Sequence, residues 1–185
     1  LCVAVNEKDS VPQEYSAIFD HVVRIKNVGL KHAMANEWQI WDLTPYKETI
    51  HVEADMIFNT NVDHWWDELQ KHELFFTSKV YDYRGNLAKS NFYRRHFDKM
   101  NLPKLYNGLY YFRYSETAHK FFKKAKEVSA RYKPYADYFF AGHWYPETPT
   151  TDEIFAISAY MLDLDDKVFD TSYSLPYFTH MKVRL

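Results

Sequence analysis

Residues 43–57 read LTPYKETIHVEADMI and contain three successive structural signals. Thr44–Pro45 ends a preceding helix pattern, because proline lacks an N–H and restricts the residue before it to extended backbone. The β-branched and apolar residues Thr49–Val52 then predict a strand. This strand leads directly into Glu53 and Asp55. We therefore expect two carboxylates at the end of a strand, where open α/β sheets form their ligand crevices.

The spacing of these two acids suggests a metal site. Side chains alternate between the two faces of an extended chain, so Glu53 and Asp55 are expected to point the same way. Carboxylate oxygens arranged in this way suit a hard divalent cation such as Mg²⁺ or Mn²⁺. Taken alone, an acid-x-acid triplet is common on protein surfaces, and chance placement is then the default interpretation.

Helix and strand patterns alternate on both sides of this segment. Apolar residues recur at helical spacing between Gly29 and Leu43, and an aromatic strand with an interruption at Asn107-Gly108 precedes a helix capped by Ser115. The other expected strands are Leu1–Val5, His21–Ile25, Phe75–Tyr83, Leu105–Tyr114 and Tyr177–Val183, and the other helices are Val62–His72, Ser115–Tyr132 and Asp152–Leu162. This order predicts an α/β fold, a layered mixed sheet with helices on both faces. No linker or internal repeat divides residues 1–185, so we expect one domain.

The composition removes several classes of protein. With 46% hydrophobic residues and 19% aromatic residues in a chain of 185, the sequence has the content of a packed domain and not of a disordered one. Its 4 glycines include no phosphate-binding loop, which excludes a P-loop NTPase and a Rossmann dehydrogenase. A Gly-x-Ser-x-Gly nucleophile motif is also absent. Charged residues make up 26%, and no apolar run reaches the roughly 20 residues of a spanning helix, so no membrane span is expected.

Charge and cysteine content restrict partners and location. The formal net charge is −2, which gives nucleic-acid binding no support although a small basic patch is not excluded. The single cysteine, Cys2, cannot form an internal disulfide, so we expect a cytoplasmic protein. The chain begins at Leu1 inside an apolar run, and we interpret it as a fragment or as a chain whose first residues are absent.

Several segments, taken in order, resemble the GT-A glycosyltransferases, in particular the glycogenin and galactosyltransferase-like families. Residues 43–57 are similar to the segment around the family's Asp-x-Asp motif, in which a Ser/Thr-Pro-aromatic turn leads into a hydrophobic strand. The other matching segments are the post-motif helix at Val62–Trp66, the Asn-Gly strand at Tyr106–Phe112, the acidic helix start at Pro149–Phe155 and the His…Lys element at Thr179–Lys182. The resemblance covers roughly Thr44 to Lys182, and its specificity lies in the order and spacing of the motifs.

The resemblance implies a role for the metal-binding and phosphate-binding residues. Asp55 would ligate a Mn²⁺ or Mg²⁺ ion that bridges the diphosphate of a nucleotide-sugar, with a UDP-sugar favoured. Glu53 would ligate the same ion or reach the ribose, and His180 would complete the metal shell. Lys182 would neutralise the leaving diphosphate, whose negative charge grows as it departs.

It also implies where the sugar and the acceptor bind. Asn107 and Gly108 would border the sugar. Asp152 and Glu153 would hydrogen-bond hydroxyl groups of the sugar or acceptor, and one of them would act as the base of an inverting mechanism. The His…Lys ending favours retention of anomeric configuration instead, so both outcomes stay open.

The sequence departs from the family pattern in two places. Glu53 stands where the family usually has aspartate, which puts the role of the longer side chain in doubt. The two strands expected at Leu1–Val5 and His21–Ile25 look like later strands of the nucleotide-binding half, so the first βαβ unit is missing or divergent.

Plainer interpretations exist for each candidate. Asn107-Gly108 is also an ordinary tight-turn sequence, and Asp152-Glu153 also suits the electrostatics of a helix start. His180 is also compatible with a structural histidine. The aromatic residues of Tyr138–Tyr145, in an expected loop before the acidic pair, are candidates for stacking on the acceptor.

Three functional hypotheses follow from the sequence. The first is a metal-dependent glycosyltransferase that moves a sugar from a nucleotide-sugar to a hydroxyl acceptor. The second is a catalytically degenerate GT-A-like domain that binds a glycan or a protein partner. The third is a viral transferase that glycosylates hydroxymethylated DNA bases, against which the nearly neutral charge argues.

Overall fold

The computed structural model describes residues 1–29, 33–78, 80–87, 97, 99–164 and 178–180, with the backbone alone for 33, 34, 178 and 180. Its elements in chain order are β1 (Cys2–Asn6), the 3₁₀ helix η1 (Gln13–Ile18), β2 (His21–Ile25), the 3₁₀ helix η2 (Ala33–Gln39), α1 (Ile40–Leu43), β3 (Glu48–Val52), α2 (His64–Leu69), β4 (Leu74–Thr77), β5 (Val80–Asp82), β6 (Tyr106–Arg113), α4 (Glu116–Ala130), α5 (Tyr132–Phe139), α6 (Thr151–Met161) and β7 (Phe178–His180).

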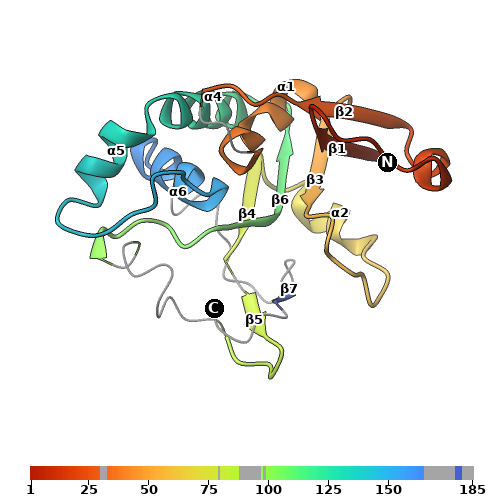
Figure 1. Cartoon of the computed structure of the whole chain (residues 1–185). Helices are drawn as coiled ribbons and strands as arrows, with labels where there is room; N and C mark the ends of the chain where they lie inside the picture. Colours follow the sequence, from red (N-terminus) through yellow and green to blue (C-terminus); the bar gives the residue numbers. More distant parts are fainter. Residues whose placement is uncertain (30–32, 79, 88–96, 98, 165–177, 181–185) are drawn as a thin grey trace.

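The strands within the described ranges belong to three small sheets, whose arrangement is drawn in Figure 1. The central sheet has the order β3-β6-β4 and is antiparallel on both sides of β6. β1 pairs with β2 and β5 pairs with β7, each in parallel. The fold is therefore mixed α/β, as the alternating sequence pattern predicts.

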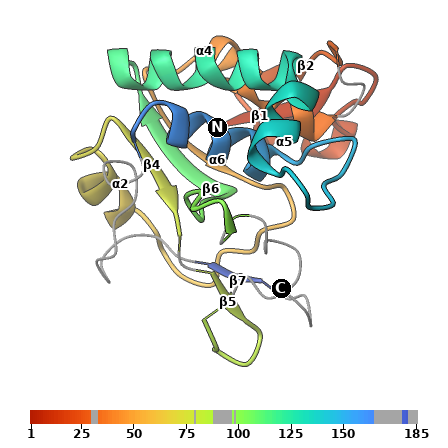
Figure 2. The ribbon, with the colours of Figure 1, turned by 90° about the vertical axis from the view of Figure 1, so that its left-hand side faces the viewer.

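Helices cover both faces of the central sheet (Figure 2). On one face, Tyr110 and Phe112 of β6 and Phe76 of β4 pack in one cluster with α4 and α6. On the opposite face, Tyr111 packs in a second cluster with Leu69 of α2. Successive strand residues point to opposite faces, so β6 can supply both clusters from adjacent aromatic positions.

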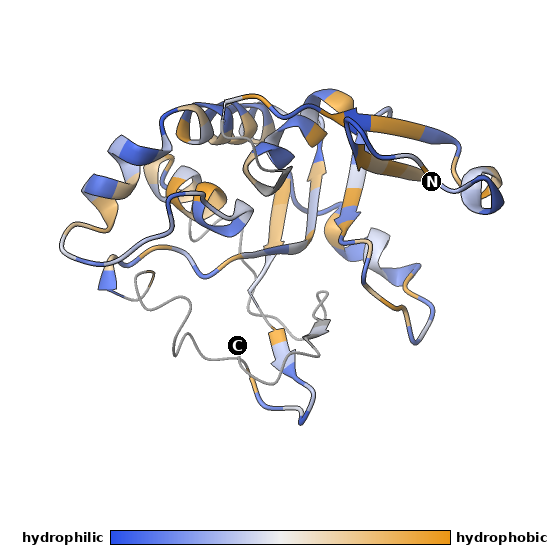
Figure 3. Cartoon of the chain, viewed as in Figure 1, coloured by the Kyte–Doolittle hydropathy of each residue, from blue (hydrophilic) through white to orange (hydrophobic). Residues whose placement is uncertain are grey.

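The core of the domain is largely aromatic. The rings of Phe76, Tyr110, Phe121, Phe122 and Phe155 lie within 4.9–6.4 Å of one or more neighbouring ring centroids, mostly tilted or edge to face. Such pairs add to the hydrophobic burial of each ring. Figure 3 shows the same division by hydropathy, with apolar residues along β4 and polar residues on the outer side of α4. The high aromatic content of the sequence is thus used mainly in packing.

Side-chain caps begin two of the helices, and the one at Ser115 is the cap that the sequence predicts. The Ser115 side chain accepts a hydrogen bond from the backbone of Ala118 at the start of α4. Thr150 and Glu153 form a capping box at the start of α6, in which each side chain binds the other residue's backbone N–H. These bonds satisfy N–H groups that have no partner inside the helix.

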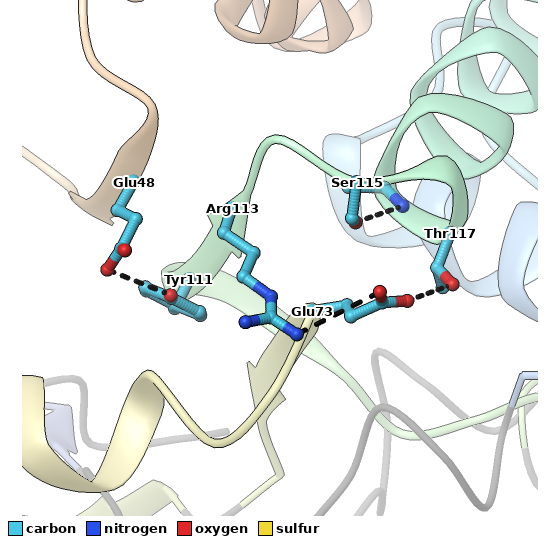
Figure 4. A network of polar contacts seen from close by, with 7 residues as sticks. Glu48, Glu73, Tyr111, Arg113, Ser115 and Thr117 are labelled. Atoms are coloured by element: carbon cyan, nitrogen blue, oxygen red, sulfur yellow. Dashed lines mark hydrogen bonds and ion pairs between the residues drawn. The ribbon is translucent and has the colours of Figure 1, made fainter.

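A polar network lies at the end of the central sheet where β3 begins and β6 ends, and it ties these strands to α4 (Figure 4). The Tyr111 hydroxyl donates to Glu48 Oε2 at 3.3 Å, joining β6 to β3. Glu73, just before β4, accepts a hydrogen bond from Thr117 of α4, and its Oε1 lies 3.9 Å from Arg113 Nη2. The groups are partly exposed, so this network contributes mainly to positioning.

Three expectations from the sequence need correction. The single helix expected between Gly29 and Leu43 is instead the 3₁₀ helix η2 followed by the short α1. Gln39, the last residue of η2, binds both the N–H and the C=O of Lys26 through its side chain. The strand expected at Phe75–Tyr83 is divided between β4 and β5, which belong to different sheets. Helix α5 is not among the expected elements, and its last residues, Tyr138 and Phe139, fall in the segment 138–145 that we expect to be a loop.

Within the described ranges, no helix combines the length and the apolar character needed to cross a membrane.

We predict that Phe155→Ala lowers the free energy of unfolding by about 3–5 kcal/mol, because it removes a fully buried ring from the centre of the aromatic cluster. Urea denaturation followed by circular dichroism measures the change. The control is Met161→Ala on the same helix, where the side chain is partly exposed and the expected loss is below about 1 kcal/mol. Similar losses for the two variants would contradict this packing.

Candidate functional site

One end of the central sheet brings together three segments that are distant in sequence. β3 ends there, β6 begins there, and α6 begins beside them (Figure 1). The backbone N–H of Glu53 donates to the Gly108 carbonyl at 3.1 Å. The backbone N–H of Asn107 donates to Asp152 Oδ1 at 2.8 Å. Four predicted site residues, Glu53, Asn107, Gly108 and Asp152, are thereby joined by two hydrogen bonds.

An irregularity in β6 places Asn107 in this position. Tyr110 pairs with Phe76 of β4, but the next residue of β4, Thr77, pairs with Tyr106, so residues 107–109 lack regular partners on that strand. Bulges of this kind interrupt the alternation of side chains and redirect one of them. The predicted interruption at Asn107-Gly108 is therefore found in the pairing with β4, while β6 itself continues.

Glu37, in η2, completes a polar network with Asn107. Asn107 Nδ2 donates to Glu37 Oε2 at 2.8 Å, and the Thr151 side chain hydrogen-bonds to the same carboxyl group. Burial, assisted by the charges of Glu53 and Asp152 and opposed by these two hydrogen bonds, raises the pKa of Glu37 from 4.5 to about 7. A carboxyl group that titrates near neutral pH can accept or release a proton during a reaction.

His51 and Tyr110 lie next to this network with unsatisfied polar atoms. Their rings stack at a centroid distance of 4.3 Å. The His51 ring hydrogen-bonds to the Asn107 backbone, and burial lowers the pKa of His51 from 6.5 to about 4. Among the described residues, neither His51 Nδ1 nor the Tyr110 hydroxyl has a hydrogen-bond partner, although both atoms are buried. Burial and the charge of Glu37 raise the pKa of Tyr110 well above its usual range.

The two acids of the Glu53-Ala54-Asp55 triplet do not continue the strand. β3 ends at Val52, and the N–H of Met56 donates to the Glu53 carbonyl at 3.2 Å, which closes a turn. The extended geometry expected for the triplet is therefore wrong, and the alternation argument does not apply to it. Glu53 and Asp55 are both exposed, in one surface turn beside Gly108.

The acidic pair at the start of α6 is divided between two environments. Asp152 faces Asn107, as described above. Glu153 is 2% exposed, and its carboxylate accepts a hydrogen bond from the Thr150 backbone at 2.9 Å. Glu153 thus has a structural use in the capping box, and Asp152 is the member of the pair that reaches the site.

The C-terminal candidates are only partly described. The backbone of His180 belongs to β7 and pairs in register with Asp82 of β5. Figures 1 and 2 place β5 and β7 beyond the same end of the central sheet as the network. Lys182 lies outside the described residues.

The carboxylates of Glu53 and Asp55 are oxygen donors of the kind that Mg²⁺ and Mn²⁺ prefer. In the portion of the chain that the structure describes, no group of three or more His, Cys, Asp or Glu residues has the geometry to hold a metal ion. Two exposed carboxylates in one turn therefore fit the expected cation by chemistry, while a complete ligand set is not found among the described groups.

The aromatic segment 138–145 is divided between surface and core: Phe139 and Phe140 are buried in the main cluster, while Tyr138 and Trp144 are exposed. Tyr138 is on the last turn of α5, and Trp144 is 83% exposed in the loop that leads to α6. The Tyr145 hydroxyl donates to Asp137, which holds the base of this loop against α5. The rings of Tyr138 and Trp144 are therefore exposed, and their stacking on an acceptor stays a prediction; the first residues of the segment are helical, not a loop.

Sequence reasoning did not select Glu37, His51 or Tyr110. Glu37 falls on the apolar stripe formed by Leu30, Met34, Trp38 and Trp41 when helical spacing is applied, and an acid at such a position is a signal of functional or structural burial. His51 is a polar, titratable residue inside the otherwise β-branched and apolar strand Thr49–Val52, which is the signal that could have drawn attention to it. Tyr110 has no distinguishing signal among its aromatic neighbours.

Comparisons with protein families, with curated proteins and with solved structures each find no match for this chain.

We predict that Glu37 and His51 contribute opposite pH dependences to stability. The pKa of Glu37 is raised on folding, so between about pH 4.5 and 7 the unfolded chain binds fewer protons and the folded state loses stability as pH rises. The pKa of His51 is lowered on folding, so between about pH 4 and 6.5 the unfolded chain binds more protons and stability is lost as pH falls.

Urea denaturation of Glu37→Gln and His51→Gln across pH 4–8 measures how each side chain contributes to the pH dependence of the free energy of unfolding. Relative to the wild type, Glu37→Gln should gain about 3 kcal/mol in free energy of unfolding between pH 4.5 and 7, and His51→Gln should lose a similar amount between pH 4 and 6.5. Profiles that run parallel to the wild type would show that neither group titrates as its burial indicates.

Proposed function

We propose that this chain is a GT-A-type glycosyltransferase domain that moves a sugar from a nucleotide-diphosphate sugar, with a UDP-sugar favoured, to a hydroxyl acceptor. The observation that carries the proposal is the hydrogen bond between Asn107 and Asp152, together with the bond that brings Glu53 to Gly108. The resemblance assigns Asn107 and Gly108 to the border of the sugar, Asp152 to hydroxyl groups of the sugar or acceptor, and Glu53 to the metal ion or the ribose of the same donor. Amides and carboxylates that converge in this way are suited to sugar hydroxyl groups.

In the proposed reaction, Asp152 binds the acceptor hydroxyl group and takes up its proton. The acceptor oxygen forms a bond to the anomeric carbon of the sugar as the bond from that carbon to the phosphate oxygen breaks. The nucleoside diphosphate leaves with the bonding electron pair. General-base assistance of this type contributes about 10²–10⁴ in rate.

Glu53 and Asp55 would hold the divalent cation that such a donor requires. The cation would supply positive charge beside the leaving diphosphate, where negative charge develops. His180 and Lys182 remain the predicted further ligand and phosphate contact.

A second candidate is a non-catalytic domain of the same fold that binds a glycan or a protein partner. Glutamate in place of the usual aspartate at position 53 favours it, as do the exposed rings of Tyr138 and Trp144. Isothermal titration with UDP in the presence of Mn²⁺ separates the two candidates. Tight binding that depends on Mn²⁺ favours the transferase, and glycan binding without any response to UDP favours the alternative.

We predict that Asp55→Ala abolishes Mn²⁺-dependent hydrolysis of UDP- and GDP-sugars, because it removes an acidic ligand of the cation. Release of nucleoside diphosphate measures this activity, with and without a chelator. The matched control is Asp67→Ala, which removes another exposed aspartate from the nearby helix α2 and should leave the metal dependence unchanged. Retained activity with normal metal dependence in Asp55→Ala would refute the assignment.

We predict that Asp152→Asn lowers the same hydrolysis by at least about 100-fold, because an amide cannot accept the proton of the attacking hydroxyl or water. The hydrogen bond from the Asn107 backbone can persist in this variant, so the fold should be retained. Glu147→Gln, in the exposed loop before α6, serves as the control for loss of one charge. Equal rates for Asp152→Asn and the wild type would exclude Asp152 as the base, and NMR of the product anomers would establish the stereochemical course.

A further inference from the structure

Two buried polar atoms of the central sheet have no hydrogen-bond partner among the described residues. They are the Tyr110 hydroxyl group and His51 Nδ1. Tyr110 is 0% exposed, and it stands opposite His51 in the register between β6 and β3, so the two side chains lie on the same face of the sheet. Their rings stack at a centroid distance of 4.3 Å and an interplanar angle of 20°. The two atoms therefore belong to one buried place.

The hydrogen-bonding role of His51 Nδ1 follows from the bond that the other ring nitrogen makes. The His51 ring hydrogen-bonds to the Asn107 backbone, and this bond favours the charged ring, as a bond donated to a carbonyl oxygen does. Nε2 is therefore the donor. Burial lowers the pKa of His51 to about 4, so the ring is neutral near pH 7. A neutral imidazole has one donor and one acceptor nitrogen, which leaves Nδ1 as an acceptor that needs a donor.

The Glu37 carboxyl group is a third polar group close to this place. Burial and, after it, the charge of Glu37 raise the pKa of Tyr110, yet the Tyr110 hydroxyl bonds to no group in the described part of the chain. Two polar groups that interact across more than hydrogen-bond distance are commonly bridged by water. Near neutral pH, Glu37 is present both as carboxylate and as carboxylic acid, because its pKa is about 7. A water molecule both donates and accepts, so it is a partner for either form.

Other ligands fit this place less well than water. An anion is disfavoured, because the charges of Glu53 and Asp152 already raise the pKa of Glu37. A divalent cation takes six or more oxygen ligands, and no group of three or more His, Cys, Asp or Glu residues in the described ranges has the geometry to hold one. A sugar hydroxyl group does not reach the fully buried Tyr110. Water needs only two to four polar partners.

We propose that one internal water molecule is bound between the Tyr110 hydroxyl group, His51 Nδ1 and the Glu37 carboxyl group. The water accepts the Tyr110 O–H and donates one of its own O–H groups to Nδ1. Its third bond is donated to the Glu37 carboxylate or accepted from the carboxylic acid. About three hydrogen bonds are usual for a buried water, and they remove the cost of leaving buried polar atoms unpaired. This inference does not depend on the proposed function, and it extends the network of Glu37 and Asn107 into the aromatic core.

A crystal structure of the wild-type chain at high resolution tests the site directly. We expect density for one water oxygen at about 2.6–3.2 Å from both Tyr110 Oη and His51 Nδ1. A direct hydrogen bond from the Tyr110 hydroxyl to Glu37 or to another protein group would overturn the proposal. Two separate waters, or well-ordered rings with no density between them, would overturn it as well.

Tyr110→Phe tests the same site in solution. Loss of a hydroxyl group that is bonded to a buried water leaves that water short of one partner, so the equilibrium constant for unfolding should rise about three- to tenfold. Loss of a hydroxyl group that has no partner removes a desolvation cost instead, and the constant then stays the same or falls. Urea denaturation at neutral pH measures the constant. A value at or below that of the wild type contradicts the proposal.

Magnetic relaxation dispersion of the water oxygen nuclei supplies the matched control, because it detects waters that stay inside a protein. Tyr110→Phe should lose the signal of one such water. Tyr111→Phe is the same change at the adjacent, equally buried residue on the opposite face, and it should lose none, because the Tyr111 hydroxyl has Glu48 as its partner. Equal signals for Tyr110→Phe and the wild type would count against a water held by Tyr110. The crystal structure decides the question whether or not either variant folds.

Discussion

The side chain and backbone of Asn107 form the junction on which the candidate site depends. Its amide binds Glu37 of η2, and its backbone N–H binds Asp152 at the start of α6. One residue of β6 thus fixes two elements that lie 70 and 45 positions away in the chain. Partly buried hydrogen bonds of this kind are costly to leave unmade, so these two contacts help to define the relative placement of the three elements.

The aromatic core holds this junction in place. Tyr110 and Phe112 anchor β6 against α4 and α6 on one face, and Tyr111 anchors it against α2 on the other. β6 is also the central strand of its sheet, with β3 and β4 as neighbours. β6 is held by neighbouring strands and by packing on both faces. The irregular pairing at residues 107–109 can therefore position a side chain without loosening the sheet. Packing and site geometry are therefore parts of one arrangement.

Much of the secondary structure was predictable from local patterns. The strand at Thr49–Val52 and the cap at Ser115 follow from β-branched residues and from a side chain that binds nearby backbone, which are short-range effects. Of the candidate site, the resemblance names Asn107 and Asp152, and the structure joins them by a hydrogen bond, while their role in binding a sugar stays a prediction. Glu37 is not predicted as a site residue, because helical spacing indicates only that it faces the core. It does not indicate that Asn107, 70 residues away in the chain, is its hydrogen-bond partner.

The sequence by itself determined the α/β class, the aromatic core and the acidic, amide-containing character of the candidate site, because these depend on periodicity and on residue type. Only the tertiary structure decided the rest. It turned the chain at Glu53, so that the triplet with Asp55 is not extended, and it committed Glu153 to a helix cap while leaving Asp152 beside Asn107. It also buried Glu37 and His51, whose pKa shifts arise from removal from water. Desolvation and contacts across 45 to 70 residues depend on how distant segments pack, which local sequence patterns do not encode.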